Sequence, residues 1–190
     1  MSTKAIIFDC FGVLYHGARS FVLDQVSDEI RPRVNELFDQ ADYGIITTAE
    51  FVEQVAEEMG VLAQDVEVML SSQYRRNEML VSRLERLRIK YRVGLLSNVN
   101  DTLIRRLFTD EELERFFDVV VMSSSVGMIK PHPEIYELTA HRLGVDPHEC
   151  IMIDDVLANI DGARAVGMDG VICESTEQCL ADLRSKGVDI

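Results

Sequence analysis

The sequence has no excess of basic residues. Lys and Arg together number 19, against 33 for Asp and Glu, which gives a formal net charge of −14 and a pI near 4.6. Proteins bind nucleic acids largely by neutralising phosphates with Lys and Arg, so this balance argues against a nucleic-acid partner. It argues equally against an anionic membrane surface. A small anionic metabolite stays compatible, because a pocket can be locally positive on an acidic protein.

Long apolar segments and paired cysteines are also lacking. No apolar run approaches the ~20 residues of a membrane helix, and the run after Lys4 stops at Asp9, which is too short for a signal peptide. The four cysteines form no CxxC pair, which favours reduced thiols over disulfides or a zinc site. They are Cys10, Cys150, Cys173 and Cys179. We therefore expect a cytoplasmic protein with no membrane partner; the sequence does not set its oligomeric state.

Short apolar runs, in contrast, alternate with longer segments of helical periodicity. Runs that are apolar throughout fit strands buried on both faces, as in a parallel sheet. They are 5–8, 92–96, 119–122, 151–153 and 170–173. Between them, apolar residues recur at helical spacing, as in Leu80, Leu84 and Leu87. This alternation predicts an α/β fold with a doubly wound parallel sheet.

Polar side chains stand at the carboxyl ends of the first four runs. They are Asp9, Ser97, Ser123, Asp154 and Asp155. Ligands of open α/β sheets bind at the carboxyl ends of the strands. We therefore expect these groups to lie along one edge of the sheet, where a binding site would form.

Residues 16–76 interrupt the alternation and contain no clear strand run. Several apolar stripes at helical spacing occur here, and Thr47 to Glu50 offers a capping box for one of the helices. We therefore expect two parts. An α/β core comprises residues 1–15 and 77–190, and an all-helical insertion comprises the rest.

Four motifs make the sequence resemble the haloacid dehalogenase-like hydrolase superfamily. The segment IIFDCFGVL, which contains Asp9, is similar to the first motif of that family, and LLSN is similar to the second. Lys130 in GMIKPHPEIY resembles the third motif, and Asp154-Asp155 in IMIDDVLANIDGA resembles the fourth. Each motif is weak alone, but their order at the strand ends is specific. The insertion fits the helical cap of the family in size and position.

The resemblance implies a Mg²⁺-dependent hydrolase that acts on a small phosphorylated metabolite. Its nucleophile would be Asp9, which would form an aspartyl-phosphate. The implied metal ligands are Asp9, the backbone carbonyl of Phe11, Asp154 and Asp155, the last directly or through water. The residues implied to bind the substrate are Phe11, Ser97, Asn98 and Lys130, and of these Ser97 and Lys130 also have catalytic roles. A helix that starts near Asn100 would add its positive end.

Each motif also has a purely structural explanation. Asp9 could simply end a strand, Ser97 and Asn98 could cap a helix, and Lys130 could be a solvated loop charge. The acid pair of the fourth motif could cap a helix whose dipole favours negative charge. These explanations account for the sites one by one. They do not account for a nucleophile, a hydroxyl, a cation and an acid pair in this order.

At one position the sequence departs from the phosphatases of the family. They carry a second Asp two residues after the nucleophile, which protonates the leaving oxygen and then activates water; here that residue is Phe11. General acid–base catalysis contributes ~10²–10⁴ in rate, so we expect slow turnover of alkyl phosphates. Tyr15 and His16 are close enough in sequence to be considered as substitutes.

Three functions therefore stay open. The first, which we favour, is a phosphatase with modest or atypical activity. The second is a carbon–halogen hydrolase, because the dehalogenases of the family have Tyr at the position of Phe11 and halide leaves without a proton. Those enzymes lack the acidic pair that this chain keeps as Asp154 and Asp155. The third is a non-catalytic, regulatory protein that binds Mg²⁺ and a phosphate ligand.

Overall fold

The central sheet of the protein is parallel throughout. The computed structural model describes residues 3–42, 45–99 and 101–190. The strand order is β5-β4-β1-β6-β7, and each neighbouring pair is parallel. The strands are β1 (Ala5–Phe8), β4 (Arg92–Ser97), β5 (Val119–Met122), β6 (Cys150–Asp154) and β7 (Asp169–Ile172). The predicted doubly wound α/β fold is confirmed.

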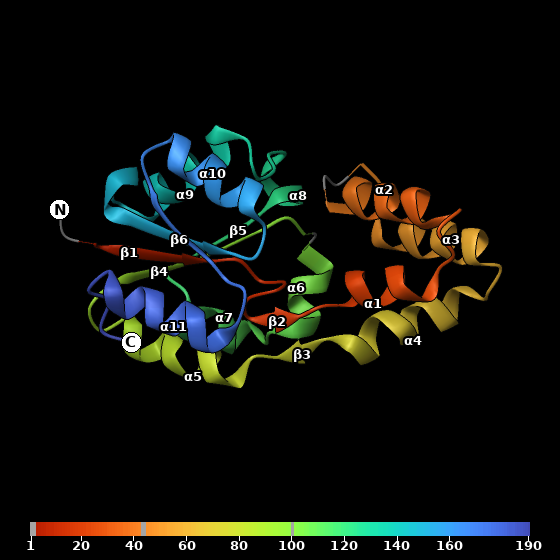
Figure 1. Ribbon diagram of the computed structural model, residues 1–190, viewed down its shortest axis with the longest axis horizontal. Helices are drawn as coiled ribbons and strands as arrows, with labels where there is room; N and C mark the ends of the chain where they lie inside the picture. The colour runs from red at the N-terminus through yellow and green to blue at the C-terminus, as the bar shows by residue number, and fades with distance from the viewer. Residues whose placement is uncertain (1–2, 43–44, 100) are drawn as a thin grey trace.

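Helices cover both faces of this sheet (Figure 1). One face carries α9 (Pro133–Leu143) and α10 (Leu157–Ala165), and the other carries α5 (Glu78–Leu87) and α11 (Thr176–Ser185). Alternate residues of β1 supply the two cores: Ile7 belongs to the cluster of α9 and α10, whereas Phe8 belongs to the cluster of α5 and α11. Because both faces are covered, the strands are apolar throughout rather than alternating.

Short helices complete the connections between the strands. They are α6 (Asp101–Leu107), α7 (Asp110–Phe116), α8 (Ser123–Val126) and the 3₁₀ helix η1 (Pro147–Glu149). At the start of α8, the hydroxyl of Ser123 accepts a hydrogen bond from the backbone N–H of Val99 at 2.9 Å, which ties the loop after β4 to β5. Among the described residues, no helix is both long enough and apolar enough to cross a bilayer.

Four further helices, which we call the helical region, pack around an apolar cluster of their own (Figure 1). They are α1 (Ala18–Gln25), α2 (Arg31–Asp42), α3 (Thr48–Met59) and α4 (Ala63–Gln73). Val34, Leu37 and Val55 are fully buried in this cluster. The capping box at the start of α3 forms as the sequence predicts, with Thr47 and Glu50 bonding to each other's backbone N–H.

A short antiparallel pair joins the helical region to the sheet. It consists of β2 (Tyr15–His16) and β3 (Arg75–Arg76), with Tyr15 opposite Arg76. The sequence did not indicate these strands, because two residues cannot show a period of two. It did not single out α1 either, a helix in which Val22 is fully buried and Leu23 only partly. The division at residues 16–76 stays a prediction.

Candidate active site

Three strands end at the same edge of the sheet, each with a polar residue. Asp9 follows β1, and Ser97 and Asp154 are the last residues of β4 and β6. The backbone N–H of Asp9 donates to the carbonyl of Ile153 at 2.9 Å, so the ladder between β1 and β6 continues to the site. All three side chains are buried. The strand ends thus bring these predicted site residues together.

Three carboxylates form a cluster at this edge. One oxygen each from Asp9, Asp154 and Asp155 lies within 4.8 Å of the others. The turn after β1 leaves room for Asp155 only because residue 12 is glycine: its φ is +79°, and a Cβ there would lie 2.1 Å from Asp155 Oδ2. Clustered carboxylate oxygens are the ligand type that Mg²⁺ prefers. The donor set therefore fits a divalent cation.

A buried lysine lies between two of these carboxylates. Lys130 Nζ is 2.9 Å from Asp9 Oδ1 and 2.6 Å from Asp154 Oδ2, and the Lys130 side chain is 1% exposed. The lysine comes from the loop before α9, 24 residues ahead of Asp154 in the chain. A charge this deeply buried is stable only when it is paired, and here it has two partners.

The pKa values of Asp9 and Lys130 depend on both burial and neighbouring charges. Burial raises the pKa of the Asp9 carboxyl, the ammonium group of Lys130 opposes the rise, and the nearby Asp154 and Asp155 add to it. Burial lowers the pKa of Lys130, but Asp154 and Asp9 raise it more, so the net pKa lies above the ordinary value. Lys130 therefore stays protonated, and the pKa of Asp9 lies above its ordinary value.

Hydrogen bonds fix the orientation of Asp154. Its Oδ1 accepts from the backbone N–H of Val156 at 2.9 Å, and Asn159 Nδ2 donates to both carboxylate oxygens at 3.0 and 3.1 Å. The hydroxyl of Tyr136 on α9 donates to the backbone carbonyl of Asn159 at 2.7 Å. The sequence did not assign a role to Asn159 or Tyr136. Asn159 stands in the fourth motif and offered a signal, whereas Tyr136 reads as one more apolar residue of α9.

Asn98 holds Lys130 in place through a reciprocal pair of hydrogen bonds. Its Nδ2 donates to the Lys130 carbonyl at 3.0 Å, and its Oδ1 accepts from the Lys130 N–H at 2.9 Å. The side chain of Asn98 thus positions the lysine, and the predicted role of Asn98 in substrate binding stays a prediction. The neighbouring Ser97 Oγ is buried and has no hydrogen-bond partner in the described chain. An unsatisfied buried hydroxyl aimed at this edge fits a ligand oxygen. Asn100 lies outside the described residues.

Phe11, at the position of the acid in the phosphatases of the family, lines the cavity of the site, whereas Tyr15 and His16 do not. Phe11 lines this cavity, and its ring centroid is 5.5 Å from that of Tyr74. Tyr15 is buried, and its hydroxyl donates to the backbone carbonyl of Leu107. His16 is exposed on β2. Neither is among the residues that line the cavity. The role of the Phe11 carbonyl as a metal ligand stays a prediction.

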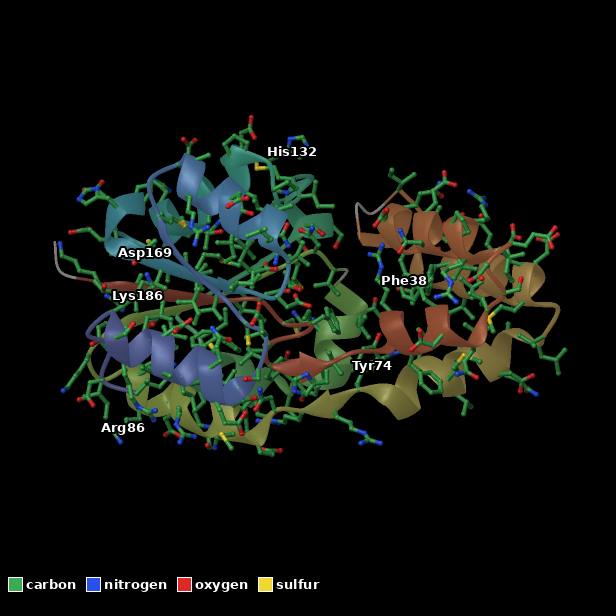
Figure 2. The ribbon with its side chains drawn as sticks, viewed as in Figure 1. Phe38, Tyr74, Arg86, His132, Asp169 and Lys186 are labelled. Carbon is green, nitrogen blue, oxygen red and sulfur yellow. The ribbon has the colours of Figure 1, made fainter. Side chains whose placement is uncertain are left out.

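The cavity, of about 420 Å³, lies between the sheet edge and the helical region. The sheet side contributes the charged and polar groups Asp9, Ser97, Asn98, Lys130, Asp155 and Asn159. The helical region and its connection to β3 contribute Arg19, Leu23, Phe38 and Tyr74. In Figure 2, Phe38 and Tyr74 lie at the end of the helical region that is nearest the sheet. The sequence did not single out these four residues, because no motif marks them.

Comparison with known proteins agrees with this fold. The model of the haloacid dehalogenase-like hydrolase family matches residues 3–167. The chain is 42% identical over 59 residues to fructose-1-phosphate phosphatase of Escherichia coli, which covers 31% of each chain. It is 32% identical over 81 residues to (S)-2-haloacid dehalogenase 4A of Burkholderia cepacia, which covers 43% of this chain and 35% of the dehalogenase.

A solved structure extends the likeness to most of the chain. It is a HAD family enzyme from Bacteroides thetaiotaomicron in complex with magnesium and inorganic phosphate, 26% identical, with a TM-score of 0.76. The superposition covers 92% of this chain and 96% of that one. The curated relatives match over only 13% to 46% of their own length.

The fold and the clustered strand-end acids define an α/β hydrolytic enzyme. Since the family model covers most of the sequence, the chain belongs to the haloacid dehalogenase-like hydrolases.

Proposed function

We propose that this protein is a Mg²⁺-dependent phosphatase that works through an aspartyl-phosphate on Asp9. The observation that carries the proposal is the buried Lys130 Nζ, 2.9 Å from Asp9 and 2.6 Å from Asp154, beside a cavity. Phosphatases among the relatives and the related structure with magnesium and phosphate support it.

Charge balance favours a metal-assisted reaction. Three carboxylates face one ammonium group, and a phosphate monoester brings further negative charge to the same place. The residues that would hold Mg²⁺ are Asp9, Asp154, Asp155 and the carbonyl of Phe11. When bound, the cation would neutralise phosphoryl oxygens and lower the pKa of Asp9.

Each residue of the site would have a distinct role in the reaction. The Asp9 carboxylate attacks phosphorus, and the leaving oxygen departs with the electron pair of the broken P–O bond. Lys130 stabilises the charge that develops on the phosphoryl oxygens, and Ser97 Oγ donates a hydrogen bond to one of them. Asn98 and Asn159 keep Lys130 and Asp154 in position. Water finally attacks the aspartyl-phosphate and releases phosphate.

The insertion of residues 16–76, which contains the helical region, would act as a cap that selects a small anionic metabolite. It contributes Leu23 and Phe38 to the cavity opposite the reacting groups, while the sheet supplies the polar ones. A cytoplasmic location is part of the proposal, since all four cysteines are free and buried, as in proteins of a reducing compartment.

A carbon–halogen hydrolase is the second candidate. An aromatic residue at position 11 and a dehalogenase among the relatives favour it. Against it stands the acid cluster, because a cation beside Asp9 would draw electron density from a nucleophile that attacks carbon. We rank it below phosphoryl transfer for that reason.

The test is phosphate release by the purified protein with aryl and sugar phosphates, with Mg²⁺ and with EDTA, in parallel with halide release from short 2-haloacids. We expect Mg²⁺-dependent phosphate release. Asp9→Asn should lower kcat/KM by at least about 10⁴-fold, because the nucleophile is lost. In the wild type, mass spectrometry after acid quench should find one phosphoryl group on the peptide that contains Asp9.

Asp189→Asn is the matched control, because this exposed carboxylate pairs with Arg86 outside the cavity. It should keep full activity. Halide release without metal would instead establish the dehalogenase. Calorimetric binding of Mg²⁺ by a protein that releases neither phosphate nor halide would instead establish the non-catalytic function.

A further inference from the structure

We propose that the substrate is the phosphate monoester of a phenol, whose oxygen leaves as a phenolate without being protonated by the protein. The proposal rests on the phosphatase function above and names its substrate class. Two observations carry it: an apolar ring at position 11, two residues after the nucleophile, and an aromatic wall on the side of the cavity opposite the reacting groups.

The first observation concerns proton donors. Phe11 lines the cavity two residues after Asp9, the position at which the phosphatases that this chain resembles carry an acid. Among the described residues that line the cavity, the guanidinium of Arg19 donates to Asp39 at 2.7 Å, and Lys130 is bound between two carboxylates. Tyr15 donates its hydroxyl proton to the backbone carbonyl of Leu107. The other ionisable groups on the described lining are Asp9 and Asp155 in the acid cluster and the phenol of Tyr74 on the opposite wall, which Tyr74→Phe removes. Without a proton, an alkoxide is too basic to leave readily, whereas a phenolate is not.

The second observation concerns the wall of the cavity. Phe11, Leu23, Phe38, Tyr74 and Leu103 form its apolar surface. The ring planes of Phe11 and Tyr74 are tilted by 48°, and Arg19 lies 5.3 Å from the centroid of Phe38. Aromatic side chains favour offset or tilted contact with another ring. A sugar would need hydrogen-bond partners for its hydroxyls, and this side offers few.

The size of the space is consistent with a substituted ring. The cavity of about 420 Å³ falls in the range of small-molecule sites. Phe38, Tyr74 and Leu103 also line a second cavity of about 290 Å³, whose other walls are largely apolar.

The reaction balances without a protein acid. Asp9 forms a bond to phosphorus, the P–O bond to the phenol breaks, and the phenolate takes a proton from solvent. Water then attacks phosphorus, the bond to Asp9 breaks, and the proton of that water returns to solvent. The second step also lacks a base at position 11. We therefore expect it to limit turnover, so that kcat/KM, and not kcat, reports the leaving group.

The experiment compares four substrates of the wild type: 4-nitrophenyl phosphate, phenyl phosphate, benzyl phosphate and a hexose 6-phosphate. Benzyl phosphate is the key probe, because it carries the same ring on an alkyl oxygen. We expect kcat/KM for phenyl phosphate to exceed that for benzyl phosphate by about 10²-fold or more. A rapid burst of nitrophenol should precede steady turnover.

Variants at Phe11 test the missing acid, and variants at Tyr74 test the aromatic wall. Phe11→Asp should narrow the ratio of phenyl to benzyl phosphate by raising turnover of the benzyl ester. Tyr74→Ala should raise KM for both aromatic esters, and Tyr74→Phe, which keeps the ring, should keep the preference over the hexose phosphate. Circular dichroism of each variant verifies folding. The comparison of substrates on the wild type does not depend on the folding of any variant.

Equal kcat/KM for phenyl and benzyl phosphate, or a faster hexose phosphate, would overturn the proposal and leave the phosphatase function intact. Acetyl phosphate, another substrate with a weakly basic leaving group, would overturn the aromatic part if its KM were lower than that of phenyl phosphate. The absence of phosphate release from every ester would overturn the phosphatase function itself.

Discussion

The sheet edge and the helical region line the same cavity with opposite kinds of surface. The sheet edge contributes charges that are buried and paired, such as Lys130 with Asp9 and Asp154. The helical region contributes Arg19 and otherwise apolar side chains such as Leu23 and Phe38, and its ion pair between Arg33 and Glu36 is exposed. Under the proposed function, the sheet edge would carry out the chemistry on the phosphate, and the helical region would select the leaving group.

The two regions also differ in how their structure is maintained. The cluster around Leu37 and Val55 shares no member with the two clusters that flank the sheet. Loss of packing in one region should therefore leave the other largely intact. The following predictions test this separation, from the largest expected effect to the smallest.

Lys130→Met should have the largest effect. It leaves Asp154 and Asp9 buried without a cation, which costs about 3–5 kcal/mol of unfolding free energy. Activity should also fall by about 10²–10³-fold, because the charge on the phosphoryl oxygens loses a partner. Urea unfolding and steady-state kinetics measure the two effects. Lys4→Met, which removes an exposed partner of Glu149, is the control and should leave both values near those of the wild type.

Leu37→Ala and Leu84→Ala form a matched pair. Both leucines are fully buried, the first in the helical region and the second beneath the sheet. Each change should cost about 2–5 kcal/mol. Hydrogen exchange should locate the loss: Leu37→Ala should speed exchange in α1–α4 and spare β1, β4 and β6, and Leu84→Ala should affect the strands. Equal acceleration in both regions would mean that the molecule unfolds as one unit.

Asp118→Asn tests a carboxylate on the sheet side away from the cavity. Burial raises the pKa of Asp118, but hydrogen bonds from the Val93 N–H and the Arg88 guanidinium lower it more, so the net pKa is below the ordinary value. A carboxyl whose pKa is lower in the folded state than in the unfolded state stabilises the folded protein at pH values above the unfolded pKa. This stabilisation is lost as the pH falls through the folded-state pKa. The variant should lose about 1–2 kcal/mol at pH ~7, since the site is partly solvated.

The stability difference between the wild type and Asp118→Asn should shrink as the pH falls below ~4, where the unfolded carboxyl takes up a proton. Urea unfolding between neutral pH and the lowest pH at which the protein stays folded measures it. A stability difference that does not change with pH would contradict the lowered pKa of Asp118 in the folded protein.

Thr47→Ala should have the smallest effect. It removes the side chain that accepts from the Glu50 N–H at the start of α3, at a cost of about 1 kcal/mol. Hydrogen exchange should show the loss in the first turns of α3. Thr47→Ser keeps the hydroxyl and should retain most of the stability. If Thr47→Ala accelerated exchange in β1 as well, the separation of the two regions would be wrong.

Features that depend on neighbours in the chain could be predicted from the sequence. The apolar runs gave the five parallel strands, because a strand buried on both faces must be apolar throughout. The capping box of Thr47 and Glu50 follows from spacing alone. The strand ends placed Asp9, Ser97 and Asp154 at one edge, because parallel strands share their carboxyl end.

Contacts between distant segments could not be predicted from the sequence. Asn98 and Lys130 are 32 residues apart, and Tyr136 and Asn159 are 23 apart, so no local pattern shows that each pair is hydrogen-bonded. The same holds for the aromatic wall, where Tyr74 comes to Phe11 from the far end of the helical region.

By itself, then, the sequence determined the five strands of the parallel sheet, the capping box of α3 and the chemical groups at the strand ends, since these depend on short-range periodicity and on sheet geometry. Only the tertiary structure decided that Lys130 is buried between Asp9 and Asp154, that Tyr15 is engaged elsewhere, and which side chains form the wall of the cavity. These outcomes depend on how side chains from separate elements fill a common space, and that packing has no signature in any one segment.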